Sequence, residues 1–312
     1  MIKFVRSLLL FVLPVVLFMF FAEILLRHIP NQYSYKAHYL EKYGNEIETL
    51  ILGSSHSYYG IDPNEFSSKT FNAASTSQTL DLDYAILQKY SDRLVNLKTV
   101  IVLISYFSLF GKMEFGIENW RLKDYHIYYD LNVPIPFKDG FEILLKGSNK
   151  KIENYFFGEN DLGLTELGQG TLFGKNPQNN LEESGKIAAK RHTAEKDTAQ
   201  MLFPEMQRYL ESIIEICQKK NCQIILITMP AWHSYIENMD IWQWQKTQET
   251  VLELEKRYRN VRYFNFMADT QFVASDFGDA DHLNPQGAKK LSRILDTIIN
   301  GQNKNSTEFE ND

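Results

Sequence analysis

The chain has 312 residues, a formal net charge of −6 at pH 7 and an aromatic content of 13%. This length suffices for one substantial hydrophobic core or two small ones. The acidic balance, and the lack of a basic run with interleaved aromatic residues, argue against a nucleic-acid-binding protein. The aromatic residues are expected mainly to pack a core, with an open sugar-stacking or apolar groove as the alternative.

Residues 7–26 form an almost continuous apolar run, SLLLFVLPVVLFMFFAEILL. At about 1.5 Å per residue, a helix of this run matches the roughly 30 Å hydrocarbon core of a bilayer. The run lacks the small-residue exit of a cleaved signal peptide and the polar face of a soluble core helix. We therefore predict a single-pass membrane anchor over residues 1–28, with bilayer contact through residues 7–26.

The charges that flank this run bear on its orientation. Lys3 and Arg6 precede it and favour a cytosolic N-terminus, whereas Arg27, Lys36 and Lys42 compete on the other side. The very short N-terminal tail and the globular sequence beyond the run favour export of the domain. We predict that the domain lies on the extracytoplasmic side of the membrane, either periplasmic or extracellular.

Strand-like and helix-like patterns alternate along the rest of the chain. The predicted strands are 48–52, 99–105, 223–229 and 261–266, and the predicted helices are 81–92, 204–219, 242–258 and 285–299. This alternation is typical of an α/β sheet with crossover helices, and continuous apolar runs suit parallel strands covered on both faces. Because ligands bind outside the carboxyl ends of such strands, we expect a site at that edge.

The predicted α/β domain spans residues 29–299. Residues 110–196 fit the alternation poorly and predict an insertion or lid over the site. Within it, residues 184–198 are highly polar and predict a mobile loop or a solvated helix. Residues 300–312 are polar and predict a disordered tail.

The two cysteines, Cys217 and Cys222, do not have the ligand spacing of a zinc site. They flank a predicted turn, where either a disulfide or two free thiols would fit. Two histidines near predicted strand ends, His56 and His233, belong to no metal-ligand spacing either. We expect no metal and no cofactor, and His233 is expected to be a surface or packing histidine.

A serine follows the first predicted strand at a glycine turn, in the sequence TLILGSSHS of residues 49–57. Gly53 permits a tight turn, and the small Ser54 leaves room beside its neighbour. Ser55 is a candidate nucleophile if a base takes its proton, and a helix N-cap is the alternative. His56 adjoins Ser55 and is a candidate for lining the site, although a sequence neighbour rarely has the geometry of a base.

The other parts of a catalytic set lie near the end of the chain, in the sequence FGDADHLNPQGA of residues 277–288. Asp279 stands three residues before His282, in a predicted turn ahead of the last helix. With Ser55 these residues supply a nucleophile, a base and a group that orients the base. Asn284 is expected to cap the helix that begins at the following proline.

These blocks resemble those of the SGNH (GDSL-like) hydrolase superfamily, in which Gly-Asp-Ser follows the first strand and Asp-x-x-His precedes the last helix. The resemblance implies a three-layer α/β sandwich with a mainly parallel central sheet of flavodoxin-like order, preceded here by one transmembrane helix. It implies Ser55 as nucleophile, His282 as base and Asp279 as its orienting carboxylate. Asp281 lies at the wrong spacing for that pattern and is expected to be a solvated turn carboxylate.

A second block, FNAASTSQT at residues 71–79, resembles the family's Asn-x-Gly-x-Ser-Gly-x-Thr segment. The match begins at Asn72 and puts Ser77 where the family has its oxyanion-hole glycine, whose backbone N–H serine can still supply. A polar turn without this role is the alternative. Taken with the other blocks, the candidate oxyanion and substrate-binding positions are Ser77, Asn72, Ser54, His56 and Ser108.

The third block departs from the family pattern. Where Gly-x-Asn-Asp is expected, the chain has Ser105, Tyr106, Phe107 and Ser108. Phe107 aligns with the asparagine that donates to the oxyanion, and the loss of one such donor costs about 3–4 kcal/mol unless it is replaced. Ser105, Tyr106 and Ser108 are the candidate replacements. Ser54, in place of aspartate, is a further departure.

With its membrane anchor and these departures, the chain resembles the extracytoplasmic members of the superfamily that modify cell-envelope polymers. Examples are the members that act in teichoic-acid D-alanylation and alginate O-acetylation. The resemblance implies a serine esterase or acyltransferase acting through an acyl-serine on a cell-envelope or extracellular glycan, or on a small ester. The alternative is a catalytically weak or inactive SGNH-fold envelope protein that binds a glycan or a partner membrane acyltransferase.

Overall fold

The computed structural model describes residues 2–144, 148–158, 161–173 and 180–308. The chain divides into two compact units. The first combines Met1–Ala37 with Asn119–Leu162, and the second combines His38–Glu118 with Gly163–Asp312. The domain boundaries at 28 and 299 stay predictions, and part of the predicted insertion groups with the N-terminal helix.

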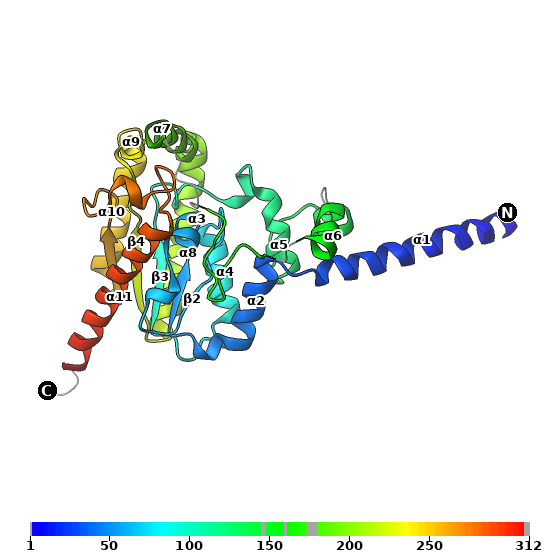
Figure 1. The fold of residues 1–312 in the computed structure, drawn as a ribbon, viewed down its shortest axis with the longest axis horizontal. Coiled ribbons are helices and arrows are strands. Elements are labelled where there is room, and N and C mark those ends of the chain that lie inside the picture. Colours follow the sequence, from blue (N-terminus) through cyan, green and yellow to red (C-terminus); the bar gives the residue numbers. More distant parts are fainter. Residues whose placement is uncertain (1, 145–147, 159–160, 174–179, 309–312) are drawn as a thin grey trace. The chain divides into compact units, whose positions relative to one another are not determined.

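The second unit contains a sheet of five strands that are all parallel to their neighbours (Figure 1). The strands are β1 (Thr49–Leu52), β2 (Thr70–Asn72), β3 (Thr99–Leu103), β4 (Gln223–Thr228) and β5 (Val261–Asn265). Their order across the sheet is β2-β1-β3-β4-β5, which is the flavodoxin-like order. The predicted α/β class with a parallel sheet is therefore confirmed.

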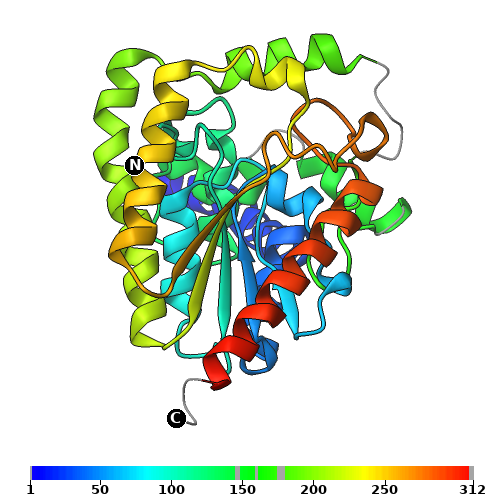
Figure 2. The ribbon, with the colours of Figure 1, turned by 90° about the vertical axis from the view of Figure 1, so that its left-hand side faces the viewer.

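Helices cover both faces of this sheet, as Figure 2 shows with α8 and α10 on one side and α11 on the other. The helices of this unit are α3 (Ser55–Gly60), α4 (Leu80–Tyr90), α7 (Leu181–His192), α8 (Lys196–Lys219), α9 (His233–Ile236), α10 (Ile241–Arg257) and α11 (Pro285–Glu308). Helix α4 packs on α8, and the short α3 packs on α11. The result is the three-layer arrangement that the sequence predicts.

Hydrophobic side chains fill the space between the layers. Ile51, Ile101 and Ile225, on three neighbouring strands, belong to one buried cluster with Leu291 and Leu295 of α11. All residues of β1 and β3 are buried, so both faces of the central strands are covered. This burial explains why these strands have continuous apolar sequences rather than an alternating pattern.

The first unit contains α1 (Ile2–His28), α5 (Leu122–Ile127) and α6 (Ser148–Phe157), and α2 (Gln32–Tyr43) follows α1 in the chain. The most apolar 18-residue stretch of α1 has a mean hydropathy of 2.8. By length and composition α1 is suited to crossing a membrane, and an N-terminal signal sequence shares these properties. Near its end, Glu23 accepts hydrogen bonds from Arg27 at 2.5 Å and from the Ile143 backbone N–H at 2.9 Å.

Strand β2, helix α8 and helix α11 differ from the sequence-based expectations. Strand β2 was not predicted, because its three residues are too few to show a periodic pattern. Helix α8 begins at Lys196, so Pro204 lies inside it rather than at its first turn. Helix α11 continues to Glu308, beyond residue 299, where the sequence predicts the start of a disordered tail. The polar residues after 299 include no proline that would end the helix.

Candidate active site

The predicted nucleophile turn lies at the carboxyl end of β1. Gly53 has a φ of 125°, and a Cβ there would lie 2.6 Å from the Leu103 Cβ, so the turn requires glycine. Its N–H donates to the buried carboxyl group of Asp83 at 2.9 Å. Ser54 occupies the N-cap position of α3 without a side-chain cap hydrogen bond, and Ser55 is the first residue of the helix. The N-cap interpretation of Ser55 is therefore wrong.

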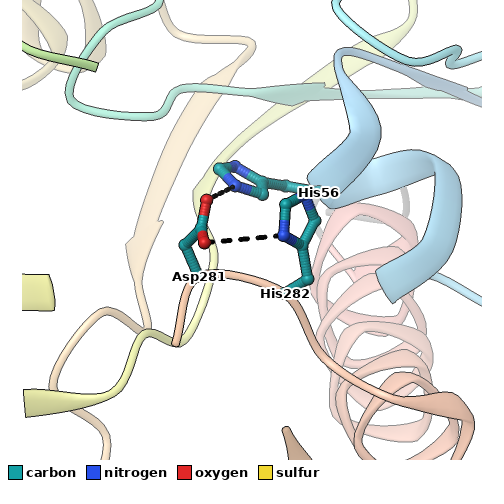
Figure 3. A group of neighbouring side chains, drawn as sticks. All are labelled: His56, Asp281 and His282. Carbon is teal, nitrogen blue, oxygen red and sulfur yellow. Dashed lines mark hydrogen bonds and ion pairs between the residues drawn. The ribbon is translucent and has the colours of Figure 1, made fainter. Parts of the chain in front are cut away.

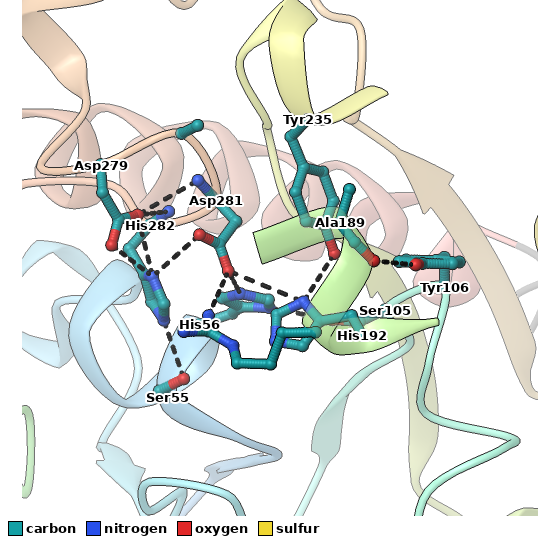
Figure 4. Close-up of polar contacts among 12 residues, drawn as sticks. Ser55, His56, Ser105, Tyr106, Ala189, His192, Tyr235, Asp279, Asp281 and His282 are labelled. Carbon is teal, nitrogen blue, oxygen red and sulfur yellow. Dashed lines mark hydrogen bonds and ion pairs between the residues drawn. The ribbon is translucent and has the colours of Figure 1, made fainter. Parts of the chain in front are cut away.

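Ser55, His282 and Asp279 form one hydrogen-bonded series (Figure 4). Ser55 Oγ lies 2.8 Å from His282 Nε2, and His282 Nδ1 lies 3.0 and 3.3 Å from the two carboxylate oxygens of Asp279. A neutral His282 with its proton on Nδ1 donates to Asp279 and accepts the Ser55 proton at Nε2. This connectivity is that of a nucleophile, a general base and an orienting carboxylate.

The loop before α11 holds His282 in this position. Asp279 Oδ1 also accepts hydrogen bonds from the backbone N–H groups of Asp281, at 3.1 Å, and of His282, at 2.8 Å. Asn284 Oδ1 accepts from two backbone N–H groups of the first turn of α11, at 2.9 and 3.0 Å. Asn284 thus caps the helix as expected, and His282 is fixed between an aspartate-centred turn and a capped helix start.

Asp281 is not the solvated turn carboxylate that the sequence predicts, because its residue is only 4% exposed. Its Oδ2 accepts a hydrogen bond from His56 Nε2 at 3.1 Å, and its Oδ1 lies 3.6 Å from His282 Nδ1 (Figure 3). The loop therefore brings both Asp279 and Asp281 to the same imidazole. Spacing along the chain singles out Asp279, but it does not show that the Asp281 side chain also points towards His282.

His56 lies in a close group with Asp281 and His282, although its spacing in the sequence indicates no such group. The ligand-type atoms of His56, Asp281 and His282 all lie within 4.8 Å of one another, and all three residues are buried. These residues come from opposite ends of the chain, so ligand spacing in the sequence could not reveal the group. Their mutual hydrogen bond and ion pair account for the clustering.

Helix α7 supplies two residues that sequence analysis missed. Arg191 Nη2 and His192 Nδ1 lie 3.6 and 3.8 Å from Asp281 Oδ2. His192 Nδ1 also lies 2.9 Å from the Tyr235 hydroxyl of α9. Burial lowers the pKa of His192 to about 3, so the ring is neutral and adds no charge beside Asp281.

Residues 184–198 were expected to form a mobile loop or a solvated helix. Much of this segment belongs to α7, and one face of that helix is buried. Ala188 and Ala189 are buried, and a Cβ at Gly185 would clash with the backbone and side chain of α9. The small residues at helical spacing were the available sequence signal. Their close packing aims Arg191 and His192 at the site.

Burial and nearby charges set the protonation of the central groups. Burial alone lowers the pKa of His282, but Asp281 and Asp279 outweigh it and raise that pKa to about 10. Burial, followed by the charge of His282, lowers the pKa of His56. Burial opposes the charged form of Asp281, yet His282 and His56 hold its pKa well below its usual range. The free site therefore favours a His282 imidazolium paired with carboxylates, beside a neutral His56.

Ser77 lies in the turn of the second block. Its φ of 60° is in the left-handed region that favours glycine, which agrees with the glycine of the family at this place. Its Oγ donates to the Glu118 carboxylate. The Ser75 N–H donates to the Gly53 carbonyl at 3.1 Å and ties this turn to the nucleophile turn. The proposed oxyanion role of Ser77 stays a prediction.

Asn72 is fully buried and supports α3 rather than facing the site. Its Nδ2 donates to the carbonyls of Ser57, at 2.9 Å, and Ile61, at 3.1 Å, while its Oδ1 accepts from the Ala74 N–H at 3.1 Å. Ser54 is buried as well, and among the described residues its Oγ has no hydrogen-bond partner. The substrate-binding assignment of these two residues has no support from their contacts.

The polar residues after β3 contact one another and His56. The Ser105 N–H donates to Ser108 Oγ at 2.9 Å, which closes a tight turn. Ser105 Oγ lies 3.0 Å from His56 Nδ1. The hydroxyls of these two serines are therefore engaged within the turn and with His56.

Tyr106 and Phe107 face α7. The Tyr106 hydroxyl donates to the Ala189 carbonyl at 2.6 Å, and the Phe107 ring centroid lies 4.2 Å from that of His192. Phe107 thus provides an apolar wall where the family pattern has an amide donor. The roles of Ser105, Tyr106 and Ser108 as replacement donors stay predictions.

Two half-buried aromatic rings lie beside the candidate base. The ring centroids of Phe173 and Tyr59 lie 4.9 and 6.3 Å from that of His282, and 5.2 Å from each other. The segment before Phe173 is bound to α3 by a hydrogen bond from the Gly170 N–H to the Tyr58 carbonyl at 2.9 Å. The part of this segment from Gly170 to Phe173 therefore covers one side of the candidate site.

The remaining candidates lie apart from this group. His233 is a surface histidine, 53% exposed in its side chain and 3.1 Å from the Glu182 carboxylate, as expected. Cys217 and Cys222 are free and buried, so the thiol alternative describes them.

No family model and no curated protein sequence matches the chain. One similar solved structure is a protein from Streptococcus pneumonia provisionally described as a platelet activating factor, with 14% identity and a TM-score of 0.42 over 93% of this chain and 98% of that chain. Another is a provisionally described acylhydrolase from Bacteroides fragilis, with 12% identity and a TM-score of 0.40 over 90% of this chain and 94% of that chain. Both TM-scores lie below 0.5, so the resemblance to SGNH hydrolases rests on the motifs and geometry of this chain.

Proposed function

We propose that the chain is a membrane-anchored, extracytoplasmic serine acyl-transfer enzyme. It removes O-acyl groups from, or adds them to, a cell-envelope or extracellular glycan or a small ester. The observation that carries this proposal is the path from Ser55 Oγ through both ring nitrogens of His282 to Asp279, with contacts of 2.8 and 3.0 Å. Helix α1, which is long and apolar enough to cross a bilayer, supports the anchor.

In the first half of the reaction, Ser55 Oγ bonds to the acyl carbon while His282 Nε2 takes the hydroxyl proton. The bond to the leaving oxygen then breaks, and that oxygen takes the proton from Nε2. Asp279 accepts the Nδ1–H throughout, which orients the ring and stabilises the imidazolium. The product of this half-reaction is an acyl-serine at Ser55.

In the second half, water or a glycan hydroxyl attacks the acyl-serine, gives its proton to His282 and releases the acyl group. Ser55 regains its proton from the same ring. The aromatic rings of Phe173 and Tyr59 beside His282 favour transfer, because an apolar cover limits the access of water. The half-buried rings also offer a surface for the apolar face of a sugar or for an acyl chain.

The weakest component of the proposed mechanism is the oxyanion hole. The backbone N–H of Ser77 is the candidate donor from the second block, whereas Phe107 provides none from its side chain. The loss of one donor lowers the rate by about 10²–10³-fold in an otherwise complete site. We therefore expect slow turnover of simple esters.

The proposal is tested by labelling the full-length protein, in detergent micelles, with a fluorophosphonate probe. We expect the probe on Ser55 in the wild-type protein and no labelling of Ser55→Ala. The matched control is Ser57→Ala, which removes a neighbouring buried hydroxyl of α3 that has no hydrogen-bond partner among the described residues. This control is expected to label like the wild type.

The alternative function is that of an inactive binding protein, which the apolar Phe107 favours. A folded wild-type protein that shows no Ser55 adduct over hours at alkaline pH would support this alternative. Equal labelling of the wild type and Ser55→Ala would show that the probe reacts elsewhere, and it would contradict the proposal.

A further inference from the structure

A second hydroxyl–imidazole–carboxylate set lies directly behind the first one. Ser105 Oγ lies 3.0 Å from His56 Nδ1, and His56 Nε2 lies 3.1 Å from Asp281 Oδ2. All three residues are buried, with exposures of 4–5%. The set repeats the order of groups in Ser55, His282 and Asp279, but with the two ring nitrogens of its histidine exchanged.

This inner set has no room for a substrate. The cavity next to it has a volume of about 10 Å³, which is close to the minimum for a single water molecule. Its lining includes His56, Ser105, Tyr235 and Asp281. Ser105 is therefore not a second nucleophile, and the purpose of the inner set must be sought in its contact with the outer one.

The contact between the two sets runs through Asp281. Its Oδ2 faces His56, and its Oδ1 lies 3.6 Å from His282 Nδ1. The two imidazole rings lie with their centroids 4.5 Å apart. His282 therefore has two carboxylate partners, Asp279 through a hydrogen bond and Asp281 through a closely spaced ion pair (Figure 4).

The hydrogen bonds assign the proton positions. Because an ionised Asp281 can only accept, His56 donates to it from Nε2. His56 Nδ1 is then free to accept from the Ser105 hydroxyl, and the ring stays neutral. A neutral His56 leaves the negative charge of Asp281 uncompensated on that side and available to His282.

Other groups also face Asp281 and bear on its charge. From α7, Arg191 lies 3.6 Å and His192 lies 3.8 Å from Oδ2, and Tyr235 of α9 contacts His192. Arg191 is about half exposed, so solvent weakens its effect. Without His56, the carboxylate would be drawn towards Arg191 and away from His282.

On the basis of the proposed function, we infer that Ser105 and His56 hold Asp281 in place as a second anionic partner of the catalytic base His282. We call Ser105, His56 and Asp281 together the positioning layer. None of the three contacts the reacting atoms in this assignment. They act by keeping one carboxylate ionised and aimed at the imidazolium that forms when Ser55 attacks. An opposite charge at this range raises the pKa of a histidine by about 1–3 pH units.

The test is a histidine NMR titration of the full-length protein in detergent micelles, with ¹³C,¹⁵N-labelled histidine. The chain has seven histidines, and the His282 signal is identified by its loss in His282→Gln. We expect Asp281→Asn to lower the pKa of His282 by about 1–3 pH units. The matched control is Asp269→Asn, a turn carboxylate that accepts from Gln271 and is expected to leave that pKa unchanged.

Two variants of His56 separate positioning from simple packing. His56→Gln keeps an N–H donor for Asp281, so the pKa of His282 should stay close to the wild-type value. His56→Leu removes the donor and should lower it, because the carboxylate then turns towards Arg191. Equal pKa values of His282 in Asp281→Asn and the wild type would overturn the inference, as would equal effects of Gln and Leu at position 56.

One measurement on the wild-type protein guards against variants that fail to fold. The ¹⁵N shifts of His56 should report a neutral ring that is protonated on Nε2 and not on Nδ1. A charged His56 or the opposite tautomer would contradict the positioning layer. Because this titration needs no acyl chemistry, its outcome is separate from that of the labelling experiment: absence of Ser55 labelling would count against the proposed function alone.

Discussion

Asp83 is a buried carboxyl group that joins the nucleophile turn to the second block. Its Oδ1 accepts hydrogen bonds from the Gly53 N–H at 2.9 Å and from Gln78 Nε2 at 2.6 Å. Burial raises its pKa to about 7, and the charge of nearby Asp81 adds to this effect. We predict that Asp83→Asn removes a pH-dependent loss of stability, because an amide oxygen accepts the same two hydrogen bonds without ionising.

The size of this effect follows from the two pKa values. The pKa in the folded state lies above the ordinary value of 3.8, so the folded chain holds the proton more tightly than the unfolded chain. This stabilisation is complete below the unfolded value and is lost as the pH rises through about 7. Roughly 2–3 kcal/mol of the free energy of unfolding is lost in this way between pH 5 and pH 8.

The assay is thermal unfolding of the full-length protein in detergent, at a series of pH values. Between pH 5 and pH 8 the wild-type melting temperature should fall by about 5–10 °C more than that of Asp83→Asn. Asp269→Asn, which alters a turn carboxylate near the surface, should follow the wild type. If Asp83→Asn shows the wild-type pH dependence, the carboxyl group does not titrate as its burial implies.

Two further predictions concern the nucleophile turn and the base. Gly53→Ala should destabilise the protein by at least about 2 kcal/mol, because residue 53 has a φ of 125° and the new Cβ would lie 2.6 Å from the Leu103 Cβ. Chemical unfolding measures this loss of stability, and a loss under about 0.5 kcal/mol would refute the prediction. Labelling of Ser55 should accelerate with rising pH into the alkaline range, because His282, with a pKa of about 10, must lose its proton to act as a base. A maximum below pH 7 in the labelling rate would contradict the ion pair between His282 and its carboxylates.

The parts of the fold that were predictable are those with long, uniform patterns. Strand β3 and strand β4 are apolar because both faces are covered, and this gives them a clear sequence signature. Strand β2 has three residues and lies at the edge of the sheet beside β1, so no pattern of its own distinguishes it from a loop. The start of α8 was misplaced because Pro204 is typical of a first turn, although the helix tolerates it further in.

The candidate site was predictable where a reactive residue type stands in a recognisable sequence block. Ser55 and His282 each follow a recognisable block, and they lie in contact because both blocks end at the carboxyl edge of the sheet. Asp281 and His56 were misjudged, because they are buried against each other from opposite ends of the chain, and such a tertiary contact leaves no signal in sequence spacing. The contribution of α7 depends on tertiary packing of Ala188 against α9 and nearby elements, which a single sequence does not show.

The most direct test of serine acyl chemistry is to trap the acyl-enzyme. The full-length protein is mixed with p-nitrophenyl acetate, quenched in acid and digested, and the peptide containing Ser55 is examined by mass spectrometry. We predict one acetyl group on Ser55 in the wild type, none in Ser55→Ala, and a much slower gain in His282→Gln. Acetylation of a folded wild-type protein only at other residues, or equal acetylation of Ser55 without His282, would contradict the proposed mechanism.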